Sequence, residues 1–209
     1  MRITVFGATG GIGTQVTRQA LEAGHDVIAV VRDPSRMDDP GRAGLRVVQA
    51  DVMDPEAIMP SLENADAVVS ALGPRGTGPT TVCGDGVASI LTAMEKVGVR
   101  RLAAVSAAGF FTEESDDLVT RLLVKPMLQR LLRHGVADTR RMEAEIRASD
   151  TDWTIVRPPR LTNRPRRGRY RQATGRSVGR TISRADVADA ILKVLATPGT
   201  IGHWIGIGN

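Results

Sequence analysis

Three glycines, Gly7, Gly10 and Gly13, follow one another at three-residue steps directly after the apolar run from residue 3 to 6. Glycines spaced in this way let the chain turn sharply, bring backbone N–H groups close to an anion and allow a helix to pack closely on a strand. A helical pattern of apolar residues begins in the same stretch, so the positive end of a helix would face that anion. The order of strand, glycine turn and helix predicts a dinucleotide pyrophosphate site, with contacts from Gly7, Thr9, Gly10, Gly11, Ile12 and Gly13.

Arg32 ends the second apolar run, 26–31, at the place where such a site meets the adenosine ribose. An acidic residue there would accept a hydrogen bond from the ribose 2′-OH and repel a 2′-phosphate, whereas a guanidinium offers a fork of donors that matches phosphate. Arg32, with Arg36 as a second contact, therefore favours NADP(H) over NAD(H). Two alternatives stay open: Asp33 is itself a potential ribose partner, and both arginines are consistent with ordinary solvated side chains.

The residues after the third and fourth apolar runs are the next candidates, because ligands of such sheets lie beyond the carboxyl ends of the strands. Asp51 is expected to accept from the adenine amino group while Val52 packs on the ring, although an Asp here is also typical of a helix cap. After the fourth run, small residues would let the backbone approach the nicotinamide-side ribose, and Arg75 would meet the pyrophosphate or an acidic substrate unless it is solvated. The contacts expected there are Ala71, Leu72, Gly73 and Arg75.

Strand-like apolar runs alternate along the chain with helical patterns, which is typical of a parallel sheet covered by helices on both faces. Strands are expected near residues 2–6, 26–31, 46–49, 66–70, 101–105 and 153–157, with a short last strand near 204–207. Helices are expected over 11–23, 55–62, 82–97, 118–134, 137–148 and 184–196. Pro126 should kink or divide the longest pair. We predict an α/β fold, a Rossmann-type doubly wound parallel sheet in a single domain spanning 1–209.

The overall composition of the chain limits the kinds of partner that we expect it to bind. The 209 residues are 42% hydrophobic, enough for one domain with a substantial core. The formal net charge is +5, but only 3% of residues are aromatic, which leaves few stacking platforms for nucleic acid. An anionic cofactor and substrate explain the basic balance better. The single cysteine, Cys83, excludes an internal disulfide, and no cluster has metal-ligand spacing. Without a signal region or a membrane-spanning run, we expect a cytoplasmic protein that binds neither nucleic acid nor membrane.

Several segments together resemble the atypical short-chain dehydrogenases/reductases, in particular the flavin reductase (biliverdin-IXβ reductase) group and the NmrA-like proteins. The resemblance covers nearly the full length and rests on the segments 5–10, 31–33, 50–52, 72–75, 79–82, 153–159 and 182–188. It implies an NADP(H)-binding Rossmann fold, with Arg32 and Arg36 at the 2′-phosphate and Pro158 beside the nicotinamide. It also implies that Asp51 and Val52 lie at adenine and that Gly73 and Arg75 lie near ribose and pyrophosphate.

The departures from that resemblance concern proton transfer. Many short-chain dehydrogenases protonate a carbonyl oxygen with a Tyr assisted by a Lys four residues on and by a Ser. The only tyrosine here, Tyr170, lies in an arginine-rich stretch without such a Lys. Thr139 occupies the position where related sequences carry the Lys, and Ala107 replaces a second hydroxyl after Ser106. The proton-donating residues of the larger family are therefore missing.

The substrate side is expected within about 107–135 and 158–182. Arg160 is our candidate contact for a substrate anion, and Ser106, which follows the fifth predicted strand, is the other candidate at the reaction centre. The neighbouring arginines are expected to form a solvated loop over 164–171. The stretch 110–117 is either a lid, with Phe110 or Phe111 stacking on an acceptor, or an acidic run that favours the start of the following helix.

A nicotinamide enzyme without a positioned acid can still reduce acceptors that take hydride into a delocalised system and collect their proton from water. We therefore expect an NADPH-dependent reductase of a flavin, quinone or related conjugated acceptor, aromatic or anionic. A non-catalytic NADP(H)-binding redox sensor of the NmrA type fits the missing residues equally well. A relative of the sugar-nucleotide epimerases is the third hypothesis, disfavoured by the absent Tyr and Lys. A homodimer is left open.

Overall fold

The computed structural model describes residues 1–74, 76–111, 122 and 125–209. Its centre is an 8-stranded sheet with the order β3-β2-β1-β4-β5-β6-β10-β8. All neighbouring strands are parallel except β10 and β8, which pair antiparallel. The strands are β1 (Arg2–Phe6), β2 (Asp26–Val31), β3 (Leu45–Gln49), β4 (Ala67–Ser70), β5 (Arg101–Val105), β6 (Asp152–Arg157), β8 (Arg171–Thr174) and β10 (His203–Gly208).

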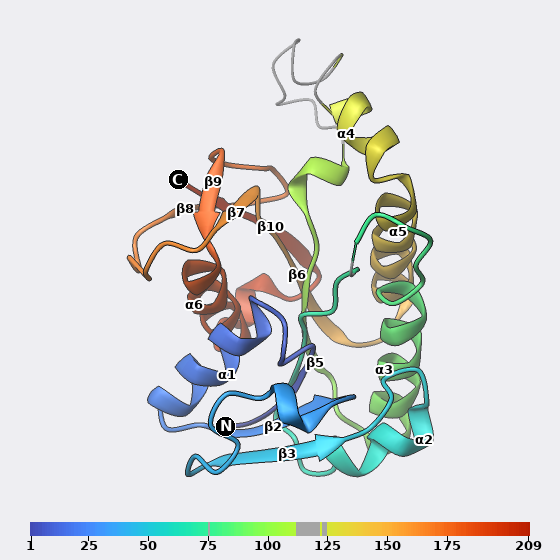
Figure 1. The fold of residues 1–209 in the computed structure, drawn as a ribbon, viewed down its shortest axis with the longest axis vertical. Coiled ribbons are helices and arrows are strands. Elements are labelled where there is room, and N and C mark those ends of the chain that lie inside the picture. Colours follow the sequence, from blue (N-terminus) through green and yellow to red (C-terminus); the bar gives the residue numbers. More distant parts are fainter. Residues whose placement is uncertain (75, 112–121, 123–124) are drawn as a thin grey trace.

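Helices cover both faces of the sheet (Figure 1). One face packs against α1 (Gly13–Glu22) and α6 (Arg184–Leu195), and the other against α2 (Pro55–Ile58), α3 (Gly84–Val97) and α5 (Arg133–Ala148). The strands serve both layers because successive side chains point to opposite faces. Ile3 and Val5 of β1 belong to the core under α1 and α6, whereas Phe6 belongs to the core under α3 and α5. The predicted Rossmann-type α/β fold is confirmed.

The sheet order creates a crevice between β1 and β4. The chain builds β1, β2 and β3 outward in one direction and then crosses over to place β4 on the other side of β1. The connections after β1 and β4 therefore diverge at the carboxyl ends of these strands. Ligands of doubly wound sheets bind at such a switch point.

The segment from 160 to 183 agrees with most of the predicted solvated loop, because residues 164–170 form no helix or strand and their arginines are exposed, but it differs at Arg171, which begins β8. It contains β8 and two further short strands, β7 (Arg160–Thr162) and β9 (Thr181–Ser183), which pair in parallel. Arg166 donates to Asp189 of α6 at 2.5 Å, and the hydroxyl of Tyr170 donates to the other oxygen of this carboxylate at 2.8 Å. The strands escaped prediction because arginines interrupt their apolar alternation and each has only three or four residues.

The two helices around Pro126 also differ in their bounds. α4 (Lys125–Leu131) begins one residue before Pro126, so the proline lies in the first turn, where its missing N–H is not needed. The division between α4 and α5 falls at Leu132 instead. Most of the predicted stretch 118–124 lies outside the described residues. Across the part of the chain that is described, no helix is both long and apolar enough to span a bilayer.

Candidate functional site: a dinucleotide cavity at the strand ends

A cavity of about 670 Å³ lies at the carboxyl ends of the parallel strands, at the switch point between β1 and β4. Nearly all the residues predicted to bind a dinucleotide line this single space. They are Gly7, Thr9, Gly10, Gly11, Ile12, Arg32, Arg36, Asp51, Val52, Ala71, Leu72, Gly73, Ser106 and Pro158. Gly13 is not part of the lining, and Arg75 lies outside the described residues.

Two close backbone contacts in the glycine turn leave no room for a side chain at Gly7 or Gly13. Gly7 has φ +78, and a Cβ on it would lie 2.5 Å from the carbonyl oxygen of Ala71. A Cβ on Gly13 would lie 2.1 Å from the carbonyl oxygen of Gly7. Gly13 therefore serves the close packing of α1 on β1 and does not face the cavity.

The start of α1 is open to a negatively charged ligand. The residue at its N-terminal boundary is Ile12, no described side chain caps the helix, and its first turn holds no acidic residue. The first N–H groups of a helix need partners outside the helix and carry its partial positive charge. The glycine turn and this uncapped helix fit a pyrophosphate.

At one end of the cavity, Arg32 and Arg36 lie beside Asp33. The carboxylate of Asp33 is engaged by Ser35, which donates from its hydroxyl at 2.6 Å and from its N–H at 3.1 Å. These bonds form the turn Pro34–Arg36 that follows β2. Oδ1 of Asp33 thus has a structural role, and two arginines line this end of the cavity beside it.

The alternative interpretation of Asp51 as a helix cap is wrong. Asp54 caps α2, accepting from the N–H groups of Glu56 at 3.0 Å and Ala57 at 3.2 Å. Asp51 lines the cavity and accepts from the N–H of Met53 at 3.0 Å, which leaves its second carboxylate oxygen for a ligand. Val52 lines the same region.

At the opposite end, Ser106 belongs to a buried hydrogen-bond network that joins three elements. Its hydroxyl donates to Oε1 of Glu143 at 2.5 Å, and the carboxylate of Glu143 is completely buried. Arg157, at the end of β6, donates to the same carboxylate through Nε at 2.8 Å and Nη2 at 2.5 Å. Arg147 adds a third donor one helical turn along α5, at 2.5 Å. Because the Ser106 proton points to Glu143, its oxygen can only accept from a ligand in the cavity.

Arg157 is also held between two aromatic rings. Its guanidinium carbon lies 3.7 Å from the ring centre of Phe111 and 4.1 Å from that of Trp204. Of the predicted lid 110–117 only Phe110 and Phe111 lie within the described residues. Phe110 lines the cavity, whereas Phe111 covers Arg157, so the choice between lid and acidic helix start stays open.

Cys83 lies in the wall of the cavity with its thiol protonated. Burial, together with the nearby charge of Asp138, raises the pKa of the Cys83 thiol to about 12. Asp138 accepts from the backbone N–H groups of Cys83 at 2.9 Å and Gly84 at 2.8 Å, so it caps α3 from the neighbouring helix. The thiol is therefore no nucleophile at neutral pH.

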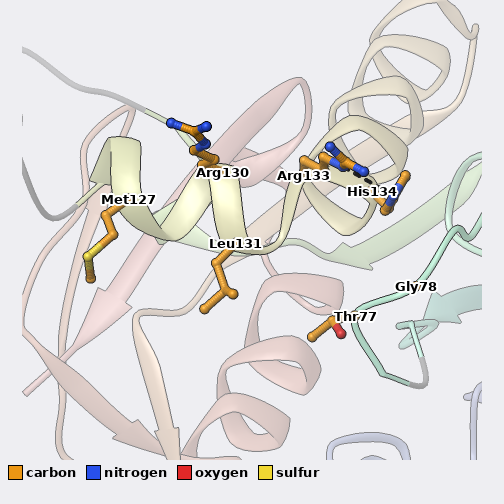
Figure 2. A pocket seen from close by; sticks show the side chains of 7 residues that line it. All are labelled: Thr77, Gly78, Met127, Arg130, Leu131, Arg133 and His134. Atoms are coloured by element: carbon orange, nitrogen blue, oxygen red, sulfur yellow. Dashed lines mark hydrogen bonds between the residues drawn. The ribbon is translucent and has the colours of Figure 1, made fainter.

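A second, more open hollow of about 500 Å³ lies where α4 meets α5 (Figure 2). Leu131 points from α4 toward Thr77, while Arg133 and His134 lie side by side at the start of α5, where Arg133 Nε is 3.3 Å from His134 Nε2. Met127 and Leu131 are 71% and 67% exposed, so the hollow combines apolar and cationic side chains. Pro74, which lines the first cavity, lies close to Gly135 of α5, where a Cβ would be 3.5 Å from Pro74 Cγ.

Arg160, predicted to contact a substrate anion, is exposed at the start of β7 and does not line the first cavity. The cavity also contains residues that sequence reasoning did not assign to it, among them Thr139, Leu161 and Arg184. The sequence drew attention to Thr139 only because it stands where related sequences carry a Lys. The one sequence signal for Arg184 was that it belongs to the segment 182–188 of the family resemblance. Because it is far from the glycines in the sequence, nothing in the sequence shows that it lies beside them in the fold.

The fold and the cavity define a nucleotide-binding protein of the Rossmann type. Residues 7–198 match the family described as NAD(P)H-binding, and the chain belongs to this family. Photosystem II assembly factor Ycf39 of Synechocystis sp. is 34% identical over 109 residues, 51% of this chain, which spans only 33% of that relative's length. UPF0659 protein C216.03 of Schizosaccharomyces pombe is 30% identical over 207 residues, covering 90% of this chain and 81% of that protein.

Solved structures share the fold over the whole chain. A short-chain dehydrogenase/reductase of Veillonella parvula in complex with NADP has a TM-score of 0.84 at 22% identity, covering 100% of this chain and 94% of that one. The anaerobilin reductase ChuY of Escherichia coli O157:H7 has a TM-score of 0.83 at 19% identity, covering 99% of this chain and 96% of that one. At these identities the likeness concerns the fold.

Proposed function

We propose that the protein is an NADPH-dependent reductase of a flavin, quinone or related conjugated acceptor. The observation that carries this proposal is the chemistry of the cavity wall. Its described residues include no Tyr, Lys or His, and the one cysteine thiol among them has its pKa raised to about 12. The described wall thus offers no acid suited to protonating a substrate carbonyl, and a conjugated acceptor needs none.

The preference for NADPH rests on the arginines after β2. Arg32 and Arg36 line the cavity, and one oxygen of the competing carboxylate of Asp33, Oδ1, already accepts two hydrogen bonds from Ser35. A 2′-phosphate would gain charge-assisted hydrogen bonds from the guanidinium groups, whereas a bare 2′-OH would not. The Veillonella parvula structure, solved with NADP, is consistent with this choice.

The bound dinucleotide supplies the hydride. The residues of this chain would hold it: the glycine turn and the start of α1 would take the pyrophosphate, and Asp51 with Val52 would take the adenine. At the other end, Ser106 accepts a hydrogen bond and Pro158 closes one side. The acceptor receives the hydride into its delocalised system and takes its proton from water. Proximity and exclusion of bulk water then supply most of the rate.

We place the acceptor between this end of the cavity and the hollow at α4 and α5. Met127 and Leu131 offer apolar contact to a ring system, while Arg133 and His134 offer a cationic partner for an acidic group. Such a surface favours a planar acceptor that carries a phosphate or carboxylate. Arg160 remains the other proposed anion contact.

The test is NADPH oxidation by the purified protein, followed at the nicotinamide absorbance with FMN, riboflavin and a quinone offered separately and NADH in parallel. Turnover with at least one acceptor, faster with NADPH, supports the reductase. Tight NADPH binding without any turnover refutes it and favours the non-catalytic redox sensor, which the missing proton donors fit equally well. Arg133→Gln should raise KM for FMN but not for riboflavin, and the exposed Arg46→Gln should change neither.

A further inference from the structure

Arg184 is the residue of the cavity whose position the proposed function leaves unused. It is the first residue of α6, far from the glycine turn in the sequence, yet its side chain crosses that turn. A Cβ built on Gly11 would lie 2.7 Å from Cδ and 2.8 Å from Nε of Arg184. The missing side chain at position 11 is therefore what lets Arg184 lie against the backbone there.

The charge of Arg184 lies in an environment that is already positive. It stands at the positive end of α6, and the neighbouring Gly11 precedes the uncapped positive end of α1. The acidic residue in its own turn, Asp186, is used by others: its carboxylate accepts from Ser183 Oγ and from the N–H groups of Arg167 and Gly168, each at 2.8 Å. Within the described part of the chain, no carboxylate forms an ion pair with Arg184.

The side chain is nevertheless held in place. Asn163, just after β7, accepts from Arg184 Nη1 at 2.5 Å. Arg184 lines the dinucleotide cavity and also a neighbouring hollow of about 760 Å³ on the other side of the glycine turn. A neutral amide partner orients the guanidinium but leaves its charge uncompensated. An anion at the glycine turn would compensate it.

We infer that Arg184 binds the pyrophosphate of the dinucleotide, as a cation that α6 places over the glycine turn. This inference shares the cofactor of the proposed function but needs no turnover. It assigns the phosphate groups of the cofactor to different arginines: Arg32 and Arg36 take the 2′-phosphate, which only NADPH carries, and Arg184 takes the central pyrophosphate, which NADH and NADPH share.

The test compares the dissociation constants of three probes, NADPH, NADH and adenosine 2′-monophosphate, for the wild type, Arg184→Gln and Arg32→Gln. Adenosine 2′-monophosphate carries the 2′-phosphate but no pyrophosphate. Arg184→Gln should weaken NADPH and NADH by the same factor, about tenfold or more, and leave adenosine 2′-monophosphate unchanged. Arg32→Gln should weaken NADPH and adenosine 2′-monophosphate and spare NADH.

Arg184→Lys keeps a charge and the packing on Gly11 but loses the planar fork, so its affinities should fall between those of the wild type and Arg184→Gln. Equal affinities of wild type and Arg184→Gln for NADPH and NADH would overturn the inference. A loss that includes adenosine 2′-monophosphate, or a lysine variant as weak as the glutamine variant at unchanged melting temperature, would overturn it as well. The measurement is independent of turnover, so a protein that binds as described but reduces nothing would refute only the reductase.

Discussion

The carboxylate of Glu143 and the guanidinium of Arg157 form a two-bond ion pair in the interior, between α5 and the end of β6. Their side chains are 0% and 6% exposed. Ser106 donates to the same carboxylate, so the pair fixes the hydroxyl at the predicted nicotinamide end of the cavity. One buried carboxylate thus couples the stability of the fold to the geometry of the site.

Replacing Glu143 by Ala should therefore lower the free energy of unfolding by about 3–5 kcal/mol, because Arg157 would be left buried without its counter-charge. Glu145→Ala is the matched control: Glu145 lies on the same helix, is half exposed and pairs only loosely with Arg141 at 3.9 Å, so its loss should cost less than about 1 kcal/mol. Urea denaturation at pH 7 measures both. Similar values for the two variants would contradict the buried pair.

Arg32→Asp should weaken NADPH binding by roughly 1–3 kcal/mol, because a charge-assisted contact to the 2′-phosphate is lost. NADH, which has a free 2′-OH in place of the phosphate, should bind no more weakly than before. Arg46→Asp on the exposed face of β3 is the control for the change in net charge. Titration of nicotinamide fluorescence gives the NADPH and NADH affinities of the wild type and both variants, and an unchanged NADPH value for Arg32→Asp would refute the 2′-phosphate assignment.

Gly13→Ala should both destabilise the protein and abolish tight cofactor binding. The added Cβ would lie 2.1 Å from the carbonyl oxygen of Gly7, so the backbone there would have to move. Gly41→Ala adds the same methyl group at a position with nothing within 4 Å and should be nearly neutral. Thermal unfolding and NADPH titration compare the two. A Gly13→Ala protein with wild-type melting temperature and affinity would show that α1 does not pack on β1 as described.

The raised pKa of Cys83 predicts that its thiol reacts slowly in the native protein. At pH 8 a thiol with a pKa near 12 is far less ionised than one at the ordinary value of 9.0, so alkylation by iodoacetamide should be at least about 100-fold slower in the native protein than in urea. The raised pKa also makes stability depend on pH. As pH rises above 9.0, the thiol of the unfolded chain loses its proton while that of the folded protein keeps it, so the free energy of unfolding falls. Native alkylation within about tenfold of the unfolded rate would contradict the buried, protonated state.

The first half of the chain could be predicted well from the sequence because its signals are local. Strand, glycine turn and helix follow one another within residues 2–22, and Arg32 comes directly after its strand. The contacts of Arg184 with Gly11 and of Glu143 with Arg157 and Ser106 join residues that are distant in the sequence. Nothing near Glu143 in the sequence marks it as buried, because it stands among the charged residues of an amphipathic helix. Tertiary packing alone places such groups.

β7, β8 and β9 escaped prediction for another reason. Each is short, and the arginines between them were read as a sign of solvation. Long side chains of this kind keep a charged end in water while their stems and backbone belong to a folded element. Arg166, in the loop between β7 and β8, shows that an arginine of this stretch can also be paired: it is half exposed, yet its guanidinium contacts the buried Asp189.

The hydrogen bonds that Asp186 accepts from the backbone of residues 167 and 168 bear on which substitutions this part of the chain can accept. Both hydrogen bonds go to main-chain N–H groups, which every residue except proline possesses. The side chain of Arg167 can therefore be exchanged for an apolar or acidic one without losing this contact with α6, whereas Gly168, at φ +66, favours glycine. Substitution at position 167 would thus change the chemistry of this surface along a fixed backbone path, whereas Gly7 and Gly13 in the cofactor half leave no room for a side chain.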